Sequence, residues 1–333
     1  MELKLFKILY KGWRRKDAKG KQSMQKELVT IALAVYNPNQ LWLKELLDSL
    51  NQQTYPNLEL VVCDDASDRE RFLDTITLIK KSITKFPFRI LQNLENLGSN
   101  RTFLRLIAEA GGSYIAFCDQ DDIWMENKIN RLYSAIKTEM AVLSYCDMRV
   151  VDRYGKVIAE SLKKKRNRLC YIEGEDLAQN YIFHNCTAGC SMLLKRECAL
   201  MADSIPEGTY WDHWLCILAS IQGKIAFVKE ALVCYRIHGA NQSGVLAGIK
   251  SWEEYYQERI LGVYRRAEML HQKGSYYSGQ REVERMVYAR KYGKIKEMWK
   301  YRALCRREVY FEIIFSRMPE GIFRGVVWLL RRI

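Results

Sequence analysis

Three carboxylates within four residues, Asp119, Asp121 and Asp122, are the strongest chemical signal in the sequence. They directly follow the apolar run 114–118, which is typical of an interior strand in a parallel sheet, and open α/β sheets bind ligands where such strands end. Because like charges this close repel one another, they need a cation or hydrogen-bond donors to balance them. Carboxylate oxygens suit Mg²⁺ or Mn²⁺, which often share a site with a diphosphate. The alternatives are a solvated acidic loop or acids that favour the start of a helix.

Aspartates at two other places also suggest chemistry. Asp64 and Asp65 end another apolar run, and Asp212 lies between Trp211 and Trp214 at the start of an apolar helix. The tryptophans can partly desolvate Asp212 and raise its pKa, which suits a general base. The alternatives are a local turn or helix cap for the first pair, an N-cap role for Asp212, and a core role for the tryptophans.

Apolar runs and amphipathic stretches alternate along the chain and must position these aspartates. The expected strands cover 28–35, 58–63, 89–91, 114–118, 141–146 and 226–235, and the expected helices cover 41–50, 71–85, 100–110, 127–138 and 213–221. This alternation predicts βαβ units and an α/β fold with a mainly parallel sheet flanked by helices. Residues 147–195 are less regular, with a hairpin-like turn at 152–155, and the chain beyond 251 is expected to be helical and basic.

The net charge of +14 is concentrated at the two ends of the 333-residue chain. Residues 1–26 contain nine Lys and Arg against two acidic residues, and residues 281–333 contain fourteen against six. Such asymmetry suggests nucleic acid or an anionic membrane surface as partner. No nucleic-acid-binding module is recognisable, which argues against nucleic acid. The ten cysteines form no framework and residues 1–25 offer no apolar signal core, so we expect reduced thiols and a cytoplasmic location.

Both basic ends also carry apolar residues at helical spacing. The apolar faces are formed by Leu5, Ile8, Leu9 and Trp13 near one end, and by Phe323, Val326, Val327 and Leu330 near the other. Basic, amphipathic helices of this kind lie in the membrane interface, and neither stretch reaches the ~20 apolar residues that span a bilayer. We therefore expect peripheral attachment. The alternative is that both helices pack on the domain with their charges outward.

Eight segments, taken in order, resemble the family two inverting glycosyltransferases. They are VTIALAVYN (29–37), LLDSLNQQTY (46–55), LVVCDDASD (60–68), NLG (96–98), DQDD (119–122), GCSMLL (189–194), WDHW (211–214) and YRIH (235–238). The resemblance covers residues 28–240, about two thirds of the chain, and implies the GT-A fold, a Rossmann-like sheet with helices on both faces. The later segments look most like the rhamnosyltransferase branch.

The resemblance implies a role for individual residues. Asp65 would accept a hydrogen bond from the N3–H of a pyrimidine, Asp119 or Asp121 would contact the ribose, and Asp212 would be the general base. Asp121 or Asp122 would hold Mg²⁺ or Mn²⁺ on the diphosphate, and His238 would complete that metal site or contact a phosphate. The remaining nucleotide-sugar contacts would come from Ala34, Tyr36, Asn37, Asp64, Gly98, Arg101, Gln120, Gly189, Cys190, Trp211 and Arg236. For Gly189, close packing of the backbone is an equally good explanation.

The expected enzyme is an inverting, metal-dependent, non-processive glycosyltransferase that acts at the cytoplasmic face of a membrane. Its donor would be a nucleoside-diphosphate sugar, dTDP-rhamnose or a UDP-sugar, and its acceptor a lipid-linked saccharide in bacterial surface polysaccharide synthesis. The expected organisation is a basic segment at 1–26, a GT-A domain at 27–245 and a helical, membrane-associating region at 246–333. The alternatives are a UDP-hexose or UDP-N-acetylhexosamine transferase, and a catalytically silent membrane-bound scaffold.

Overall fold

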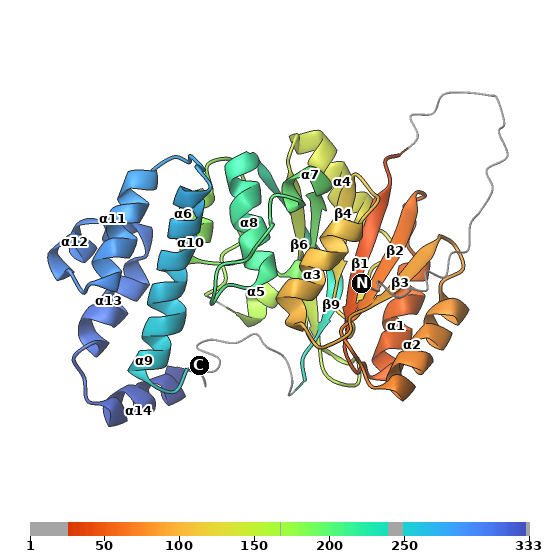
Figure 1. Ribbon diagram of the computed structural model, residues 1–333, viewed down its shortest axis with the longest axis horizontal. Coiled ribbons are helices and arrows are strands. Elements are labelled where there is room, and N and C mark those ends of the chain that lie inside the picture. The colour runs from red at the N-terminus through yellow and green to blue at the C-terminus, as the bar shows by residue number, and fades with distance from the viewer. Residues whose placement is uncertain (1–25, 167, 239–248, 331–333) are drawn as a thin grey trace, which may run out of the picture.

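The computed structural model describes residues 26–166, 168–238 and 249–330. Within these residues, nine strands form one sheet in the order β3-β2-β1-β4-β8-β6-β9-β5, with β7 paired to β6 (Figure 1). The strands are β1 (Val29–Val35), β2 (Leu58–Asp64), β3 (Phe88–Gln92), β4 (Tyr114–Cys118), β5 (Ile123–Trp124), β6 (Leu143–Val151), β7 (Val157–Ala159), β8 (Met192–Lys195) and β9 (Ile225–Arg236). The predicted α/β architecture is confirmed.

The sheet is parallel in one half and mixed in the other. Strands β1 to β4 run parallel, as predicted, but β8 runs antiparallel to both β4 and β6. The β4–β8 register pairs Ala116 with Leu193 and Tyr114 with Lys195. Continued past the end of β4, this register places Asp119 opposite Cys190. The reversed strand therefore brings the chain just before β8 to the carboxyl end of β4. The acidic turn, residues 119–122, begins at this point.

Helices cover both faces of the sheet, so its central strands are almost continuously apolar. The helices of the first two thirds are α1 (Gln40–Asn51), α2 (Arg69–Ser82), α3 (Gly98–Glu109), α4 (Lys128–Glu139), α5 (Leu162–Lys165), α6 (Ala178–Phe183), α7 (Arg196–Ala199) and α8 (Trp211–Gln222). Side chains alternate along β4: Tyr114, Ala116 and Cys118 pack in the core with α1, α2 and α4, while Ile115 and Phe117 pack with α3, α6 and α8.

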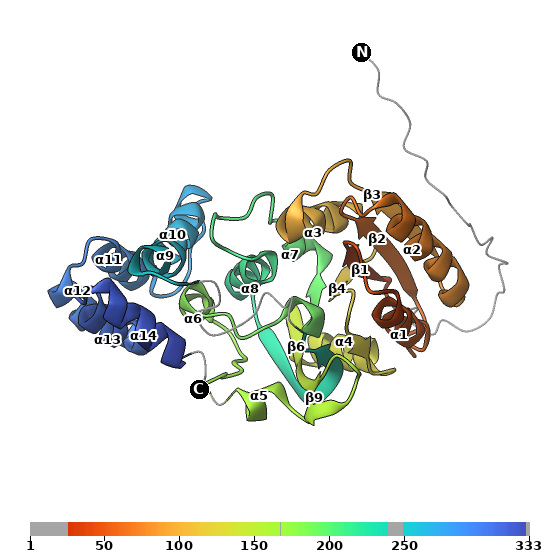
Figure 2. The same cartoon turned by 90° about the horizontal axis from the view of Figure 1, so that it is seen from below.

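The last third of the described chain is helical, as predicted, and it lies beside α6 and α8 (Figure 2). Its helices are α9 (Trp252–Tyr255), α10 (Gly262–Gln272), α11 (Gln280–Lys291), α12 (Ile295–Lys300), α13 (Arg306–Phe315) and α14 (Glu320–Leu330), with a π-helical turn at Tyr256–Leu261. Val263 and Met286 share one hydrophobic cluster with Trp214. A buried ion pair also joins α11 to α13, where Arg290 Nε donates to Glu312 Oε2 at 3.0 Å.

The expected amphipathic helix near the C-terminus forms as α14, but its apolar face packs on the protein. Phe323 and Val327 are buried in a cluster with Tyr255 of α9. The predicted N-terminal amphipathic helix lies outside the described residues. Among the residues that the structure describes, no helix is both long enough and apolar enough to cross a membrane.

Candidate active site

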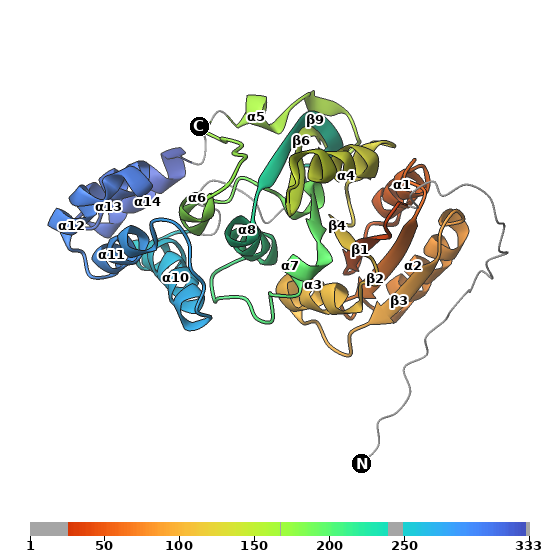
Figure 3. The same ribbon diagram turned by 90° about the horizontal axis from the view of Figure 1, so that it is seen from above.

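A cleft of about 1520 Å³ opens at the carboxyl ends of β1, β2 and β4. Most of the residues predicted from the sequence line it: Ala34, Tyr36, Asn37, Asp65, Gly98, Asp119, Gln120, Asp121, Gly189, Trp211, Asp212 and His238. They come from seven separate segments, which the sheet and α8 bring to one edge (Figure 3). Five predicted residues do not line the cleft: Asp64, Arg101, Asp122, Cys190 and Arg236.

Asp65 holds together the wall of the cleft that follows β2. Its carboxylate accepts hydrogen bonds from the backbone N–H groups of Leu97 at 2.8 Å and Gly98 at 2.9 Å, and from Asn93 Nδ2 at 2.6 Å. Gly98 has a φ of 76°, which a residue with a side chain rarely adopts. Since a carboxylate can accept about four hydrogen bonds, Asp65 retains capacity for a ligand donor.

Asp64 and Arg101 are corrections to the sequence-based site. Asp64 is fully buried below the cleft, where its Oδ1 accepts the Ser67 N–H at 2.9 Å. It therefore forms the local turn that was the alternative interpretation. Arg101 lies one turn into α3, exposed to solvent and away from the cleft lining.

The acidic turn is attached to β1 by a side-chain amide. Gln120 Oε1 accepts the backbone N–H of Tyr36 at 2.8 Å, and Gln120 Nε2 donates to the carbonyl of Tyr36 at 3.3 Å. This pairing leaves the side chains of Asp119 and Asp121 on the cleft. Burial, together with the charges of Asp121 and Asp212, raises the pKa of Asp119 to about 7.

Asp121 and His238 are candidate ligands for a divalent ion on the cleft. Asp121 Oδ2 lies 2.6 Å from His238 Nε2, and both side chains face the cleft. Carboxylate oxygens are suitable ligands for Mg²⁺ or Mn²⁺, and a cation would relieve the repulsion between Asp121 and Asp119. The donor set therefore fits the metal that the sequence predicted.

Asp122 differs from Asp119 and Asp121 because its side chain is buried and does not line the cleft. It is fully buried, its Oδ1 accepts the backbone N–H of Arg236 at 3.3 Å, and burial raises its pKa well above the usual range. Ligand atoms of Asp119, Asp122 and Cys190 lie within 4.8 Å of one another. Asp122 and Cys190 are buried and do not line the cleft, whereas Asp119 does.

Arg236 and Cys190 are buried supports for the site. The Arg236 guanidinium donates to the Asp121 carbonyl at 2.9 Å and to Glu45 Oε2 at 2.5 Å. It therefore holds the backbone of the acidic turn instead of contacting a phosphate. Cys190 is almost fully buried, and its carbonyl accepts a hydrogen bond from Lys128 Nζ at 2.5 Å.

Lys128 is a charged residue of the site that the sequence analysis did not find. Its ammonium is fully buried 3.1 Å from the centroid of the Trp124 ring. Burial lowers its pKa to about 8, while the neighbouring thiols and Asp122 act in the opposite direction. A positive charge beneath the acidic turn offsets the negative charge above it. A lysine at the start of an amphipathic helix gives no signal in the sequence that it is buried.

Asp212 lines the same cleft as the acidic turn and lies in the first turn of α8. The N-cap of α8 is Tyr210, so the N-cap interpretation of Asp212 is wrong. Asp212 Oδ2 accepts the Gly189 N–H at 3.2 Å and Oδ1 accepts the His213 N–H at 2.7 Å. Burial raises the pKa of Asp212 to about 6, although these backbone hydrogen bonds act to lower it. The group is thus poised to accept a proton near neutral pH.

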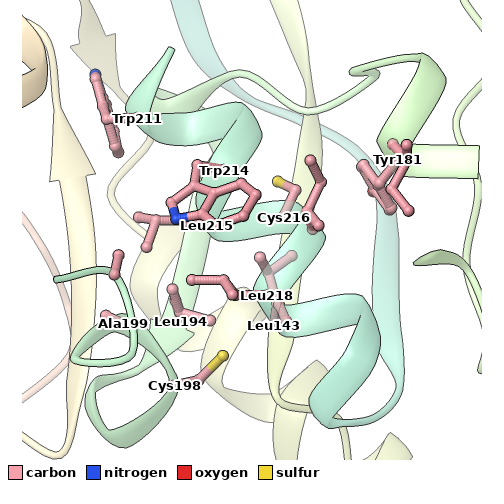
Figure 4. Close-up of a cluster of buried hydrophobic side chains, with 14 of the residues drawn as sticks. Leu143, Tyr181, Leu194, Cys198, Ala199, Trp211, Trp214, Leu215, Cys216 and Leu218 are labelled. Carbon is pink, nitrogen blue, oxygen red and sulfur yellow. The ribbon is translucent and has the colours of Figure 1, made fainter. Parts of the chain in front are cut away.

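The tryptophans beside Asp212 belong to the core. Trp214 is fully buried and packs with Leu194 and Leu218 (Figure 4). Trp211 stacks on Phe103 with ring centroids 3.9 Å apart, and it is largely buried although it lines the cleft. These contacts fix the first turn of α8, and therefore fix the position of Asp212.

Several cleft residues were not singled out from the sequence. They belong to α1, to the β6–β7 hairpin, to the loop before α6, to the segment before β8 and to the start of α8, and they include Asn39, Trp42, Asp152, Arg153, Arg166, Asn185, Thr187 and Tyr210. The two arginines could meet a phosphate. Their loops have no periodicity, so the sequence gave no indication that they meet at the cleft.

Residues 30–198, about half of the chain, match the family described as glycosyl transferase family 2. The chain belongs to this family. It is therefore a glycosyltransferase, and the scaffold alternative is not supported.

Relatives of this chain are also named as glycosyltransferases. The chain is 28% identical over 236 residues to an uncharacterized glycosyltransferase of Nostoc sp., which covers 68% of this chain and 70% of the relative. It is 26% identical over 223 residues to the UDP-Glc:alpha-D-GlcNAc-diphosphoundecaprenol beta-1,3-glucosyltransferase WfgD of Escherichia coli, covering 64% and 79% of the two chains.

Solved structures confirm the predicted GT-A fold. The protein superimposes on S. aureus TarS 1-349 in complex with UDP-GlcNAc with a TM-score of 0.57 at 16% identity, covering 80% of this chain and 72% of TarS. It superimposes on the mannosyltransferase PcManGT of Pyrobaculum calidifontis, in complex with GDP-Man and Mn2+, with a TM-score of 0.55 at 13% identity, covering 92% and 81%.

Gly189 tests how tightly the site is packed. A Cβ at this position would lie 2.3 Å from the Trp211 ring, which supports the packing explanation for this glycine. We expect Gly189→Ala to lower the free energy of unfolding by about 1–3 kcal/mol, because the ring has to move. Urea denaturation measures the change. The control is Gly325→Ala in α14, where no atom lies within 4 Å of the new Cβ; it should be neutral or stabilising by roughly 0.5–1 kcal/mol. Equal effects in both variants would contradict the packing argument.

Proposed function

We propose that this glycosyltransferase moves a hexose or N-acetylhexosamine from a UDP-sugar to a saccharide carried on a lipid diphosphate. The reaction would be a single inverting displacement, one sugar per encounter, in the synthesis of a bacterial surface polysaccharide. The observation that carries the proposal is a partly desolvated Asp212 facing the same cleft as Asp121 and His238.

The choice of donor and acceptor rests on the relatives. WfgD and a second E. coli relative, WfaP, are named for UDP-glucose and a GlcNAc-diphosphoundecaprenol acceptor. The TarS structure was solved in complex with UDP-GlcNAc. These names favour the UDP-sugar alternative over dTDP-rhamnose, which stays a prediction from sequence resemblance.

In the proposed reaction, an acceptor hydroxyl oxygen attacks the anomeric carbon as the bond from that carbon to the diphosphate oxygen breaks. The electron pair leaves with the nucleoside diphosphate, and the hydroxyl proton passes to a carboxylate oxygen of Asp212. Asp65 would accept a hydrogen bond from the uracil N3–H, and Asp119 would contact the ribose. Asp121 and His238 would hold the divalent ion, which when bound neutralises charge on the leaving diphosphate.

Attachment to an anionic membrane surface on the cytoplasmic side is part of the proposal. It is supported by exposed apolar side chains on α14, at Ile322, Trp328 and Leu329, near the exposed Arg317 and Arg324. A lipid-linked acceptor would require such contact. We propose the division into a basic segment at 1–26, a catalytic domain at 27–245 and a membrane-associating region at 246–333.

Replacing the proposed base tests the mechanism. We expect Asp212→Asn to lower kcat by about 10²–10⁴-fold, because the amide cannot take the proton. The affinity for UDP should change little. UDP release gives the rate and calorimetry gives the affinity. Asp74→Asn, at an exposed position on α2, should behave like the wild type, and a fully active Asp212→Asn variant would remove Asp212 from the mechanism.

The pH dependence of turnover provides a second test of the base. The pKa of Asp212 is raised to about 6, and the base works only when ionised. Turnover should therefore rise as the pH increases through about 6 and level off at higher pH. Rates at saturating substrate between about pH 5 and pH 8 would show this limb. A rate that is already maximal at the acidic end would contradict the assignment.

Thermal stabilisation tests the donor and the metal site together. We expect UDP with Mn²⁺ to raise the Tm more than dTDP or GDP does, since a ligand that binds only the folded form stabilises it. Asp121→Asn should abolish the Mn²⁺-dependent part of the shift, whereas Asp122→Asn should retain it. Preferential stabilisation by dTDP would support the rhamnosyl alternative, and a retained shift in Asp121→Asn would contradict the metal assignment.

A further inference from the structure

A second cavity, of about 620 Å³, lies between the catalytic domain and α13. Its walls come from the chain before α6, from the chain just after α6, and from the first turns of α13. Figures 2 and 3 both show α6 between α8 and the helices α13 and α14. The proposed donor chemistry uses none of the residues that belong to this cavity alone.

The second cavity adjoins the catalytic cleft. Leu169, Asn185 and Cys186 line both of them. In the catalytic cleft these residues lie beside Thr187, Ala188 and Gly189, and Gly189 donates its N–H to Asp212. The wall that the two cavities share is therefore part of the same chain segment that contacts the proposed base.

The wall of the second cavity is positively charged. Arg168, Arg306 and Arg307 line it, against a single carboxylate from Glu308. Glu308 lies 3.7 Å from His184 Nδ1, so it faces the histidine. Among the described residues, no carboxylate lies within ion-pair distance of these three arginines. Guanidinium groups bind phosphate oxygens through paired hydrogen bonds, so this wall suits a diphosphate.

Part of the second cavity wall is apolar. Ile172, Leu304, Phe311 and Leu330 line it, together with the ring of Tyr255. Leu330 and Phe311 belong to the two C-terminal helices, α14 and α13. Since α14 also carries the exposed apolar side chains Trp328 and Leu329, the apolar part of the cavity leads toward the surface proposed to meet the membrane.

We propose that this second cavity holds the acceptor by its diphosphate and by the first part of its lipid chain. The arginines would bind the diphosphate, the apolar side would take the chain, and the sugar would extend past Asn185 to Asp212. This assignment rests on the proposed function for its link to catalysis. The binding chemistry, an anionic diphosphate ester with an apolar tail, follows from the cavity itself.

Direct binding tests the cavity without any donor. Calorimetry on the full chain, in buffer with a metal chelator, would compare farnesyl diphosphate, geranyl diphosphate, farnesol and inorganic diphosphate. We expect farnesyl diphosphate to bind most tightly, because it alone offers both the charge and the longer chain. The double variant Arg306→Gln/Arg307→Gln should raise its Kd by about tenfold or more, since two charge-assisted contacts are lost.

A matched double variant controls for the loss of two charges. Arg281→Gln/Lys296→Gln removes two exposed cations that line neither cavity, and it should keep the wild-type Kd. The Tm of both variants would show that they are folded. An unchanged Kd in Arg306→Gln/Arg307→Gln, or equal affinity for inorganic and farnesyl diphosphate, would overturn the proposal.

Transfer assays then separate this proposal from the proposed function. With a lipid-diphosphate acceptor, Arg306→Gln/Arg307→Gln should raise the KM for the acceptor by about tenfold, but it should leave the KM for a neutral glycoside acceptor unchanged. An equal rise for both acceptors would overturn the acceptor assignment. If no UDP-sugar is transferred by the wild type, the proposed donor is wrong, while the calorimetric result for the cavity stands independently.

Discussion

The antiparallel pairing of β8 with β4 is the constraint on which the candidate site depends. It brings Gly189 and Cys190 back to the point where β4 ends and the acidic turn begins. From there the Gly189 N–H holds Asp212, and the Cys190 carbonyl holds the buried ammonium of Lys128. A strand parallel to β4 would begin at the amino end of β4, away from the acidic turn. The two halves of the cleft therefore meet because one strand is reversed.

The second requirement is electrostatic, because the acidic turn concentrates negative charge in a poorly solvated place. Lys128 offsets it from below and the Arg236 guanidinium holds its backbone from the side. Burial and the charges of Asp121 and Asp119 raise the pKa of Asp122 well above its usual range. The carboxylates of Asp119 and Asp121 face the cleft, where a cation would offset their charge.

Much of this arrangement was predictable from the sequence. The apolar run 114–118 is β4 itself, and the site residues that directly follow strands, such as Asp65 and Asp119, lie on the cleft. The fate of Asp122 was not predictable. It lies next to β5, whose two residues pair with β9 at Val233 and Cys234, and this contact between distant segments turns its side chain inward. The burial of Lys128 and Arg236 depends on long-range contacts of the same kind.

Helical periodicity at the C-terminus identified an apolar face but could not identify what covers it. Phe323 and Val327 pack on α9, so the face that suggested membrane binding is a protein core. The exposed side chains Trp328 and Leu329 lie on another part of the same helix. An amphipathic helix that is already anchored by one face can present only its remaining surface to a bilayer. Membrane contact by α14 would therefore be shallow, as suits an enzyme that takes its acceptor from the interface.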